Sequence, residues 1–124
     1  MRTTLAIAAF GAAGAVSRHL LQSLVTRRWG DDFPWGTFVV NVSGSFVLGA
    51  LVGLFAHRVG VPQWLQVAAV VGFLGAFTTF SAYTLQIYRS ASTGHVAIAL
   101  ANAFGSLAAG VLALYAGIVL ARVL

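Results

Sequence analysis

The chain has 124 residues, of which 60% are hydrophobic and only 7% are charged. A water-soluble domain of this size carries far more charge, because polar groups must cover its core. We therefore expect lipid to be the solvent for most of this protein. The length leaves room for a single domain, residues 1–124, and for no additional soluble domain.

The net charge of +5 comes from seven arginines, no lysine and two aspartates. The arginines occur singly or as one pair, mostly between apolar runs, which is typical of anchors at lipid head groups. They do not form the continuous basic stripe that a phosphate backbone requires, so we expect membrane lipid and no nucleic acid as a partner. The absence of cysteine excludes disulfides and thiolate metal sites.

Four apolar stretches are long enough to cross a bilayer, which takes about 20 helical residues. The predicted spans are residues 4–26, 36–56, 63–88 and 95–121. The breaks between them each contain Gly or Pro, as helix breaks should. Trp29, Trp35 and Trp64 lie at the boundaries, where aromatic rings prefer the membrane interface. The sequence thus predicts an all-α, multi-pass membrane protein with four transmembrane helices.

The arginines are balanced across the membrane. Three fall on each side of a four-span chain: Arg2, Arg58 and Arg122 against Arg27, Arg28 and Arg89. The positive-inside bias that normally orients a membrane protein is therefore close to nil. Two interpretations stay open: one orientation with a weak bias, or insertion in both orientations followed by pairing as an inverted dimer.

Charge is almost absent from the spans themselves. Arg18 is the only fixed charge there, and both acids of the chain, Asp31 and Asp32, lie in the first loop. A proton-coupled carrier or cation exporter usually needs a membrane-embedded carboxylate, which this chain lacks. The three histidines show no metal-ligand spacing, and no catalytic motif is present. We expect no enzyme activity.

Small and polar residues recur at helical spacing in the second and fourth spans. Those of the second span are Asn41, Ser45, Gly49 and Gly53, and those of the fourth are Asn102, Ser106 and Gly110. The pattern is typical of close helix packing, and we assign Gly49 and Gly53 to it. For Asn41, packing and pore lining both stay open.

The third span carries the stretch GFLGAFTTFS at residues 72–81. Two glycines and two threonines at mid-membrane make it a candidate for a locally broken helix, whose freed carbonyls need a partner. Phe80 and Tyr83 follow at one-turn spacing. Such a pair usually packs, but aromatic edges carry partial positive charge and can face a small anion.

Three motifs, in this order, resemble the Fluc (CrcB) fluoride channel family: GAAGAVSR at 11–18, GTFVVNVSGSF at 36–46 and GFLGAFTTFS at 72–81. The resemblance implies an inverted, dual-topology homodimer with a broken third helix. It also implies passive export of fluoride from the cytoplasm through two antiparallel pores.

The family's functional positions map onto this chain. The resemblance implies a fluoride pore lined by these residues: Arg18, Asn41, Thr79, Phe80, Tyr83 and Ser106. It further implies a structural sodium ion at the dimer centre, held by the main-chain carbonyls of Gly75 and Thr78 from both subunits.

Two departures from the family pattern stand out. Tyr83 occupies a position that is usually Phe, which brings a hydroxyl to the site, and Gln86 replaces a Glu that many members carry. The alternative function is a small multidrug-type cation exporter, another four-helix inverted dimer. It is disfavoured because the first span has no glutamate to couple protons to cations.

Overall fold

The computed structural model describes residues 1–57 and 60–124. Arg58, one of the arginines in the charge balance, lies outside the described residues. All regular secondary structure in the described part is helical. Four helical segments are long and apolar enough to cross a membrane: Arg2–Trp29, Trp35–His57, Gln63–Ser92 and Val96–Val123. The predicted all-α class with four membrane-spanning helices is confirmed.

Three of the four spans are single helices: α1 (Arg2–Trp29), α2 (Trp35–His57) and α6 (Val96–Val123). The third span is assembled from four pieces in sequence: α3 (Gln63–Val67), the π-helix η1 (Ala68–Leu74), α4 (Gly75–Phe77) and α5 (Phe80–Ser92). α1 and α2 extend beyond the predicted stretches at both ends, whereas α6 begins one residue later, at Val96, and ends two residues later, at Val123.

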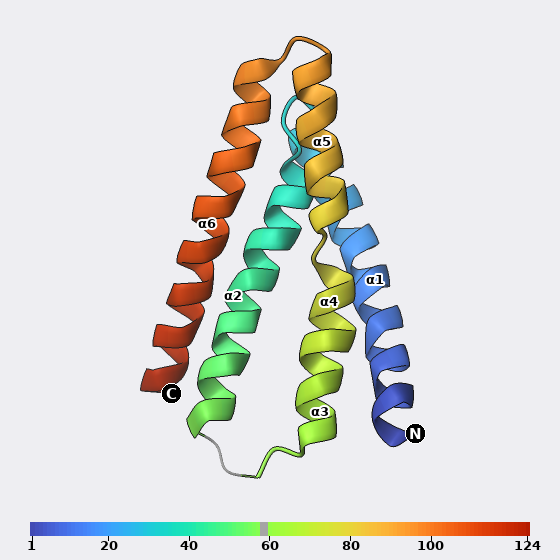
Figure 1. The fold of residues 1–124 in the computed structure, drawn as a ribbon, viewed down its shortest axis with the longest axis vertical. Coiled ribbons are helices and arrows are strands. Elements are labelled where there is room, and N and C mark those ends of the chain that lie inside the picture. Colours follow the sequence, from blue (N-terminus) through green and yellow to red (C-terminus); the bar gives the residue numbers. More distant parts are fainter. Residues whose placement is uncertain (58–59) are drawn as a thin grey trace.

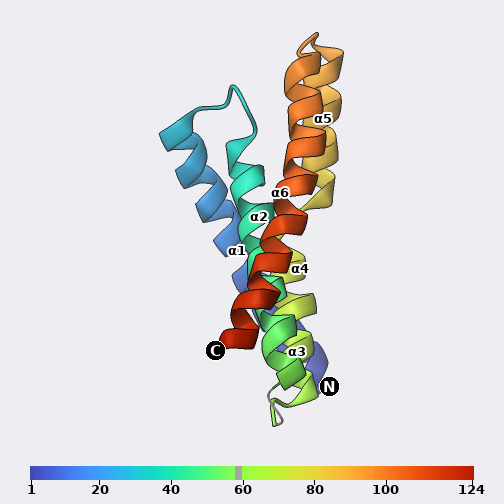
Figure 2. The same cartoon turned by 90° about the vertical axis from the view of Figure 1, so that its left-hand side faces the viewer.

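The spans alternate in direction, so both termini lie at one end of the bundle together with the start of α3 (Figure 1). The α1–α2 and α5–α6 connections lie at the other end. Turned by 90°, the bundle shows these two hairpins diverging toward that end (Figure 2).

Glycines bring α2 and α6 into backbone contact. A Cβ added to Gly49 would lie 2.0 Å from the Leu114 carbonyl oxygen, and one added to Gly117 would lie 2.2 Å from that of Phe46. A Cβ on Gly53 would lie 2.6 Å from the Ala121 methyl carbon. No larger residue fits this crossing, which confirms that Gly49 and Gly53 serve close helix packing.

A second close crossing joins α1 to the π-helix η1. A Cβ on Gly14 would lie 2.2 Å from the Phe73 carbonyl oxygen, and one on Gly72 would lie 2.9 Å from that of Ile7. The two helices therefore touch through their backbones over more than one turn. This contact fixes the position of the third span along the axis of α1.

The third span is interrupted at its centre. α4 ends at Phe77, Thr78 (φ −81°, ψ 158°) and Thr79 (φ −148°, ψ 116°) are extended, and α5 begins at Phe80. Val40, Leu74 and Phe77 form the buried core beside this point. The interruption thus lies in the middle of the bundle, where irregular backbone must find partners other than water.

About half of the large apolar side chains outside this core are exposed on the protomer. In α1, a helix of 28 residues, only Gly14 and Val25 are buried. Such surfaces suit lipid or another protein copy, and they would not suit water. Arginine and tryptophan mark the ends: Trp29 and Trp35 pack edge to face at 5.5 Å, and the Arg2 guanidinium lies 4.2 Å from the Trp64 ring centroid.

Candidate functional site

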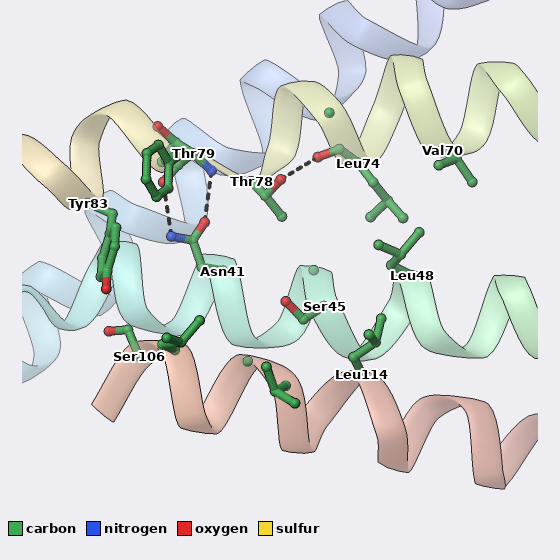
Figure 3. A pocket seen from close by; sticks show the side chains of 16 residues that line it. Asn41, Ser45, Leu48, Val70, Leu74, Thr78, Thr79, Tyr83, Ser106 and Leu114 are labelled. Atoms are coloured by element: carbon green, nitrogen blue, oxygen red, sulfur yellow. Dashed lines mark hydrogen bonds between the residues drawn. The ribbon is translucent and has the colours of Figure 1, made fainter. Parts of the chain in front are cut away.

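A cavity of about 470 Å³ lies between α2, the interrupted third span and α6 (Figure 3). Its lining is mostly apolar, with a few hydroxyl and amide groups. The lining residues are Asn41, Gly44, Ser45, Leu48, Val70, Leu74, Gly75, Thr78, Thr79, Phe80, Tyr83, Ser106, Leu107, Gly110, Val111 and Leu114. The structure therefore brings five of the six predicted pore residues to one cavity, along with the two residues predicted to hold sodium.

Asn41 binds the backbone of the interrupted segment. The Thr79 N–H donates to Asn41 Oδ1 at 2.8 Å, and Asn41 Nδ2 donates to the Thr79 carbonyl oxygen at 3.0 Å (Figure 3). A side-chain amide has the same donor and acceptor as a peptide group, so it can replace a lost backbone partner. In a continuous helix the Thr79 N–H would bond to the Gly75 oxygen. Asn41 therefore both lines the cavity and stabilises the break.

The two threonines at the break are satisfied locally. Thr78 Oγ1 donates to the Leu74 carbonyl oxygen at 2.8 Å, and Thr79 Oγ1 accepts the Ala82 N–H at 3.2 Å as the N-cap of α5. Gly44 gives Thr78 its space, because a Cβ there would lie 2.3 Å from Thr78 Cγ2. The positive end of the α5 dipole consequently begins at Phe80, beside the cavity.

The two aromatic residues behave differently. Phe80 is 76% exposed on the protomer, whereas Tyr83 is half-buried. Their ring centroids are 5.7 Å apart at an angle of 43°. The Tyr83 hydroxyl donates to the carbonyl oxygen of Ala103 in α6. The extra hydroxyl of this chain is therefore already engaged by the backbone of α6 instead of being free in the cavity.

Ser106 reaches the cavity from α6 and pairs with the residue one turn before it. Its Oγ donates to Asn102 Oδ1 at 2.8 Å. Asn102 is 1% exposed, and its Nδ2 is buried without a hydrogen-bond partner in the protomer. Asn102 and Ser106, two residues of the polar face predicted on the fourth span, thus point into the protein.

Arg18 does not line the cavity. Its Nη1 lies 3.5 Å from the Thr78 carbonyl oxygen, which is a long hydrogen bond made from the α1 side. A positive charge therefore stands next to the break without entering the cavity. In this arrangement Arg18 makes no direct contact inside the cavity, so it can act on an anion there only through its electrostatic potential.

A polar triad that the sequence did not indicate links three helices. Gln22 Nε2 of α1 and Gln86 Nε2 of α5 both donate to Thr37 Oγ1 of α2, at 3.2 and 2.9 Å. Gln86 Oε1 is buried and has no partner. The three residues are too far apart in sequence for any spacing pattern to join them. Gln86, which replaces the Glu that many family members carry, is therefore hydrogen-bonded to Thr37 in this chain.

The fold and the cavity define a class of protein. The chain has four helical segments long and apolar enough to cross a membrane, and a mostly apolar cavity with a few polar groups lies at a backbone break in the middle of the third. These features are those of a multi-pass membrane protein. Within the described residues, no three His, Cys, Asp or Glu side chains gather to hold a metal ion.

Comparison with known proteins identifies the family. The sequence profile described as "CrcB-like protein, Camphor Resistance (CrcB)" matches residues 5–118. The chain belongs to this family, and it is a multi-pass protein of the inner membrane.

Curated relatives match over nearly their whole length. A protein of Magnetococcus marinus is 43% identical over 118 residues, covering 95% of this chain and 96% of that protein. A protein of Phenylobacterium zucineum is 44% identical over 124 residues, covering 98% and 97%. Both are named fluoride-specific ion channel FluC. The expectation that the chain is not an enzyme is confirmed by this family, whose matched members are ion channels.

Proposed function

We propose that this protein is a fluoride-selective channel that lets fluoride leave the cytoplasm down its gradient. The relatives named as fluoride-specific channels support the substrate. The observation in the structure that carries the proposal is the cavity at the break, which offers amide, hydroxyl and aromatic-edge groups and contains no carboxylate. Such a lining attracts a small anion and does not repel it.

The lining can replace part of the hydration shell that fluoride loses. Asn41 uses one Nδ2 hydrogen on Thr79 and keeps its second one available. Ser45 Oγ lines the cavity as a further hydroxyl donor. The ring edges of Phe80 and Tyr83 add partial positive charge. Because these donor groups are few and each interacts weakly with an anion, fluoride stays bound loosely enough to be released, as conduction requires.

The positive potential has two fixed sources beside the cavity. The N-terminal end of α5 begins at Phe80, and helix N-termini favour anions in membrane transporters. The Arg18 guanidinium stands behind the Thr78 carbonyl. With no embedded acid to exchange protons, flow is passive and no coupling ion is needed.

The functional unit in this proposal is an inverted homodimer with two antiparallel pores. Phe80 lines the cavity but is 76% exposed on the protomer, which supports a second copy that would enclose it. The even distribution of arginines over the two sides favours insertion in both orientations.

The break also has the right chemistry for a structural sodium ion. The Thr79 N–H, which would bond to the Gly75 carbonyl in a continuous helix, donates to Asn41 instead. The Thr78 carbonyl accepts a long hydrogen bond from Arg18 Nη1 at 3.5 Å, which a bound cation would displace. Main-chain oxygens at unwound helix ends are typical sodium ligands in membrane proteins. Gly75 and Thr78 of one protomer supply two oxygens, fewer than hard cations take, so two protomers would share the ion. Replacing sodium by a large organic cation should then lower the thermal stability of the dimer.

A planar-bilayer recording separates the channel from the small multidrug-type exporter. A channel carries a steady current that reverses at the equilibrium potential of fluoride when fluoride is the permeant anion. An electroneutral exporter that exchanges protons for an organic cation carries no such current. Absence of fluoride current from folded protein, with proton-coupled cation uptake instead, would overturn the proposal.

A further inference from the structure

Tyr83 forms a link between α5 and α6 that a phenylalanine could not make. Its hydroxyl donates to the Ala103 carbonyl oxygen, 20 residues further along the chain. The view into the cavity shows the ring extending from α5 with its oxygen beside Ser106 on α6 (Figure 3). The hydroxyl of a tyrosine has one hydrogen to donate, and here a main-chain oxygen accepts it.

The link restrains the orientation of the ring. The χ2 torsion of an aromatic side chain is broad, so an untethered ring samples a range of orientations. A hydrogen bond at the para position fixes the far end of the ring to a second helix. Because Tyr83 lines the cavity and lies 5.7 Å from Phe80, fixing its ring also fixes which part of its edge faces the cavity.

We infer that the Tyr83 hydroxyl is a positioning group for anion recognition: it holds the ring edge toward the cavity and so raises the affinity for fluoride. The inference rests on the proposed function, because it concerns the same cavity. Pre-organised groups bind more tightly since less side-chain freedom is lost on binding. The same restraint slows release, so tighter binding is expected together with a lower maximal flux.

The test is the Tyr83→Phe variant, which removes only the hydroxyl. Immobilising one side chain changes affinity by about two- to tenfold. We therefore expect the half-saturating fluoride concentration of the current to rise about two- to tenfold, and the saturated current to rise as well. Replacement of Tyr83 by 4-aminophenylalanine, which retains a para donor, should restore the wild-type half-saturation. Replacement by 4-methylphenylalanine, which fills the same space without a donor, should behave like Tyr83→Phe.

The matched control is Tyr88→Phe, which removes a hydroxyl from an exposed tyrosine of the same helix and should leave half-saturation unchanged. Size-exclusion chromatography confirms that each variant is folded. A conducting wild type with the same half-saturation in Tyr83→Phe would overturn the inference and leave the proposed function intact. A wild type that conducts no fluoride would overturn both.

Discussion

Asn41 is the residue on which the backbone break depends. Its side-chain amide makes two hydrogen bonds to the backbone of one residue: it accepts the Thr79 N–H at 2.8 Å and donates to the Thr79 carbonyl oxygen at 3.0 Å. These bonds satisfy the amide N–H that the interrupted helix leaves without its usual partner. Within a bilayer no water is available to satisfy such a group, so its partner must come from the protein. Asn41 is consequently part of the scaffold as well as of the cavity lining.

Replacing Asn41 by alanine should therefore reduce both stability and transport. Leaving the Thr79 N–H unpaired costs about 1–3 kcal/mol, which should appear as a lower midpoint of thermal unfolding in detergent. Fluoride flux should fall because Thr79 and the start of α5 lose their position. Ser43→Ala is the control, since Ser43 Oγ donates only to the Val40 oxygen of its own helix. An Asn41→Ala protein as stable as the Ser43→Ala protein would contradict this role.

Phe80 allows function to be separated from folding. With 76% of its surface exposed on the protomer, it contributes little to the protomer's own core. We predict that Phe80→Ile leaves the protein folded and dimeric, because the side chain stays apolar, and impairs fluoride flux, because the aromatic edge is lost. Flux and oligomeric state should be measured on the same preparation. Unchanged flux would remove Phe80 from the mechanism.

At the scale of the elements, the contact between α1 and η1 positions the first half of the third span. Gly14 lies directly against the Phe73 carbonyl, and Gly72 lies against Ile7. The π-helix of seven residues precedes the break, and π-helical segments are rare and often found at functional sites. The position of α4 along the bundle axis and its rotation about its own axis depend on this crossing. The crossing therefore also sets where Gly75 and Thr78 lie.

Two glycines of α1 provide a matched test of this contact. A Cβ on Gly14 would lie 2.2 Å from the Phe73 oxygen, whereas a Cβ on Gly11 would meet its nearest neighbour at 3.7 Å. Gly14→Ala should destabilise the protein by about 1–3 kcal/mol through overpacking. Gly11→Ala should be neutral or slightly stabilising, because alanine favours helix. Similar unfolding midpoints for the two variants would show that the crossing is not tight.

The sequence predicted the helices more completely than the contacts between them. Apolar length and the flanking Gly, Pro and Trp residues located the four spans, because a bilayer demands about 20 apolar residues. The family resemblance supplied the positions that line the cavity. The π-helix left no recognisable pattern, since its residues are as apolar as those of an α-helix. The Gln22–Thr37–Gln86 triad and the Tyr83–Ala103 bond join residues 15 to 49 positions apart, so only the folded structure relates them.

At the scale of the whole molecule, a single copy of the chain leaves much apolar surface exposed. Its cavity is lined on one side by a largely exposed phenylalanine, and most large apolar side chains of α1 face outward. A second, inverted copy would cover these surfaces and use the balanced arginines on the two sides of the membrane. These exposed surfaces and the balanced arginines support the proposed dimer.

Dual topology can be tested by labelling, because the chain contains no cysteine. Leu124→Cys and Ser92→Cys place single thiols at opposite ends of the bundle (Figure 1). If the chain inserts both ways, a membrane-impermeant maleimide added outside intact cells should label roughly half of each variant, since no charge bias favours one orientation. Complete labelling of one variant and none of the other would contradict an inverted dimer.

The central claim is that fluoride crosses the membrane through this protein in preference to other anions. The most direct measurement is efflux from liposomes containing the purified protein, followed with fluoride and chloride electrodes in parallel. Rapid fluoride efflux with little chloride efflux is the predicted result. No fluoride efflux from protein shown to be folded, or equal efflux of the two anions, would contradict the claim.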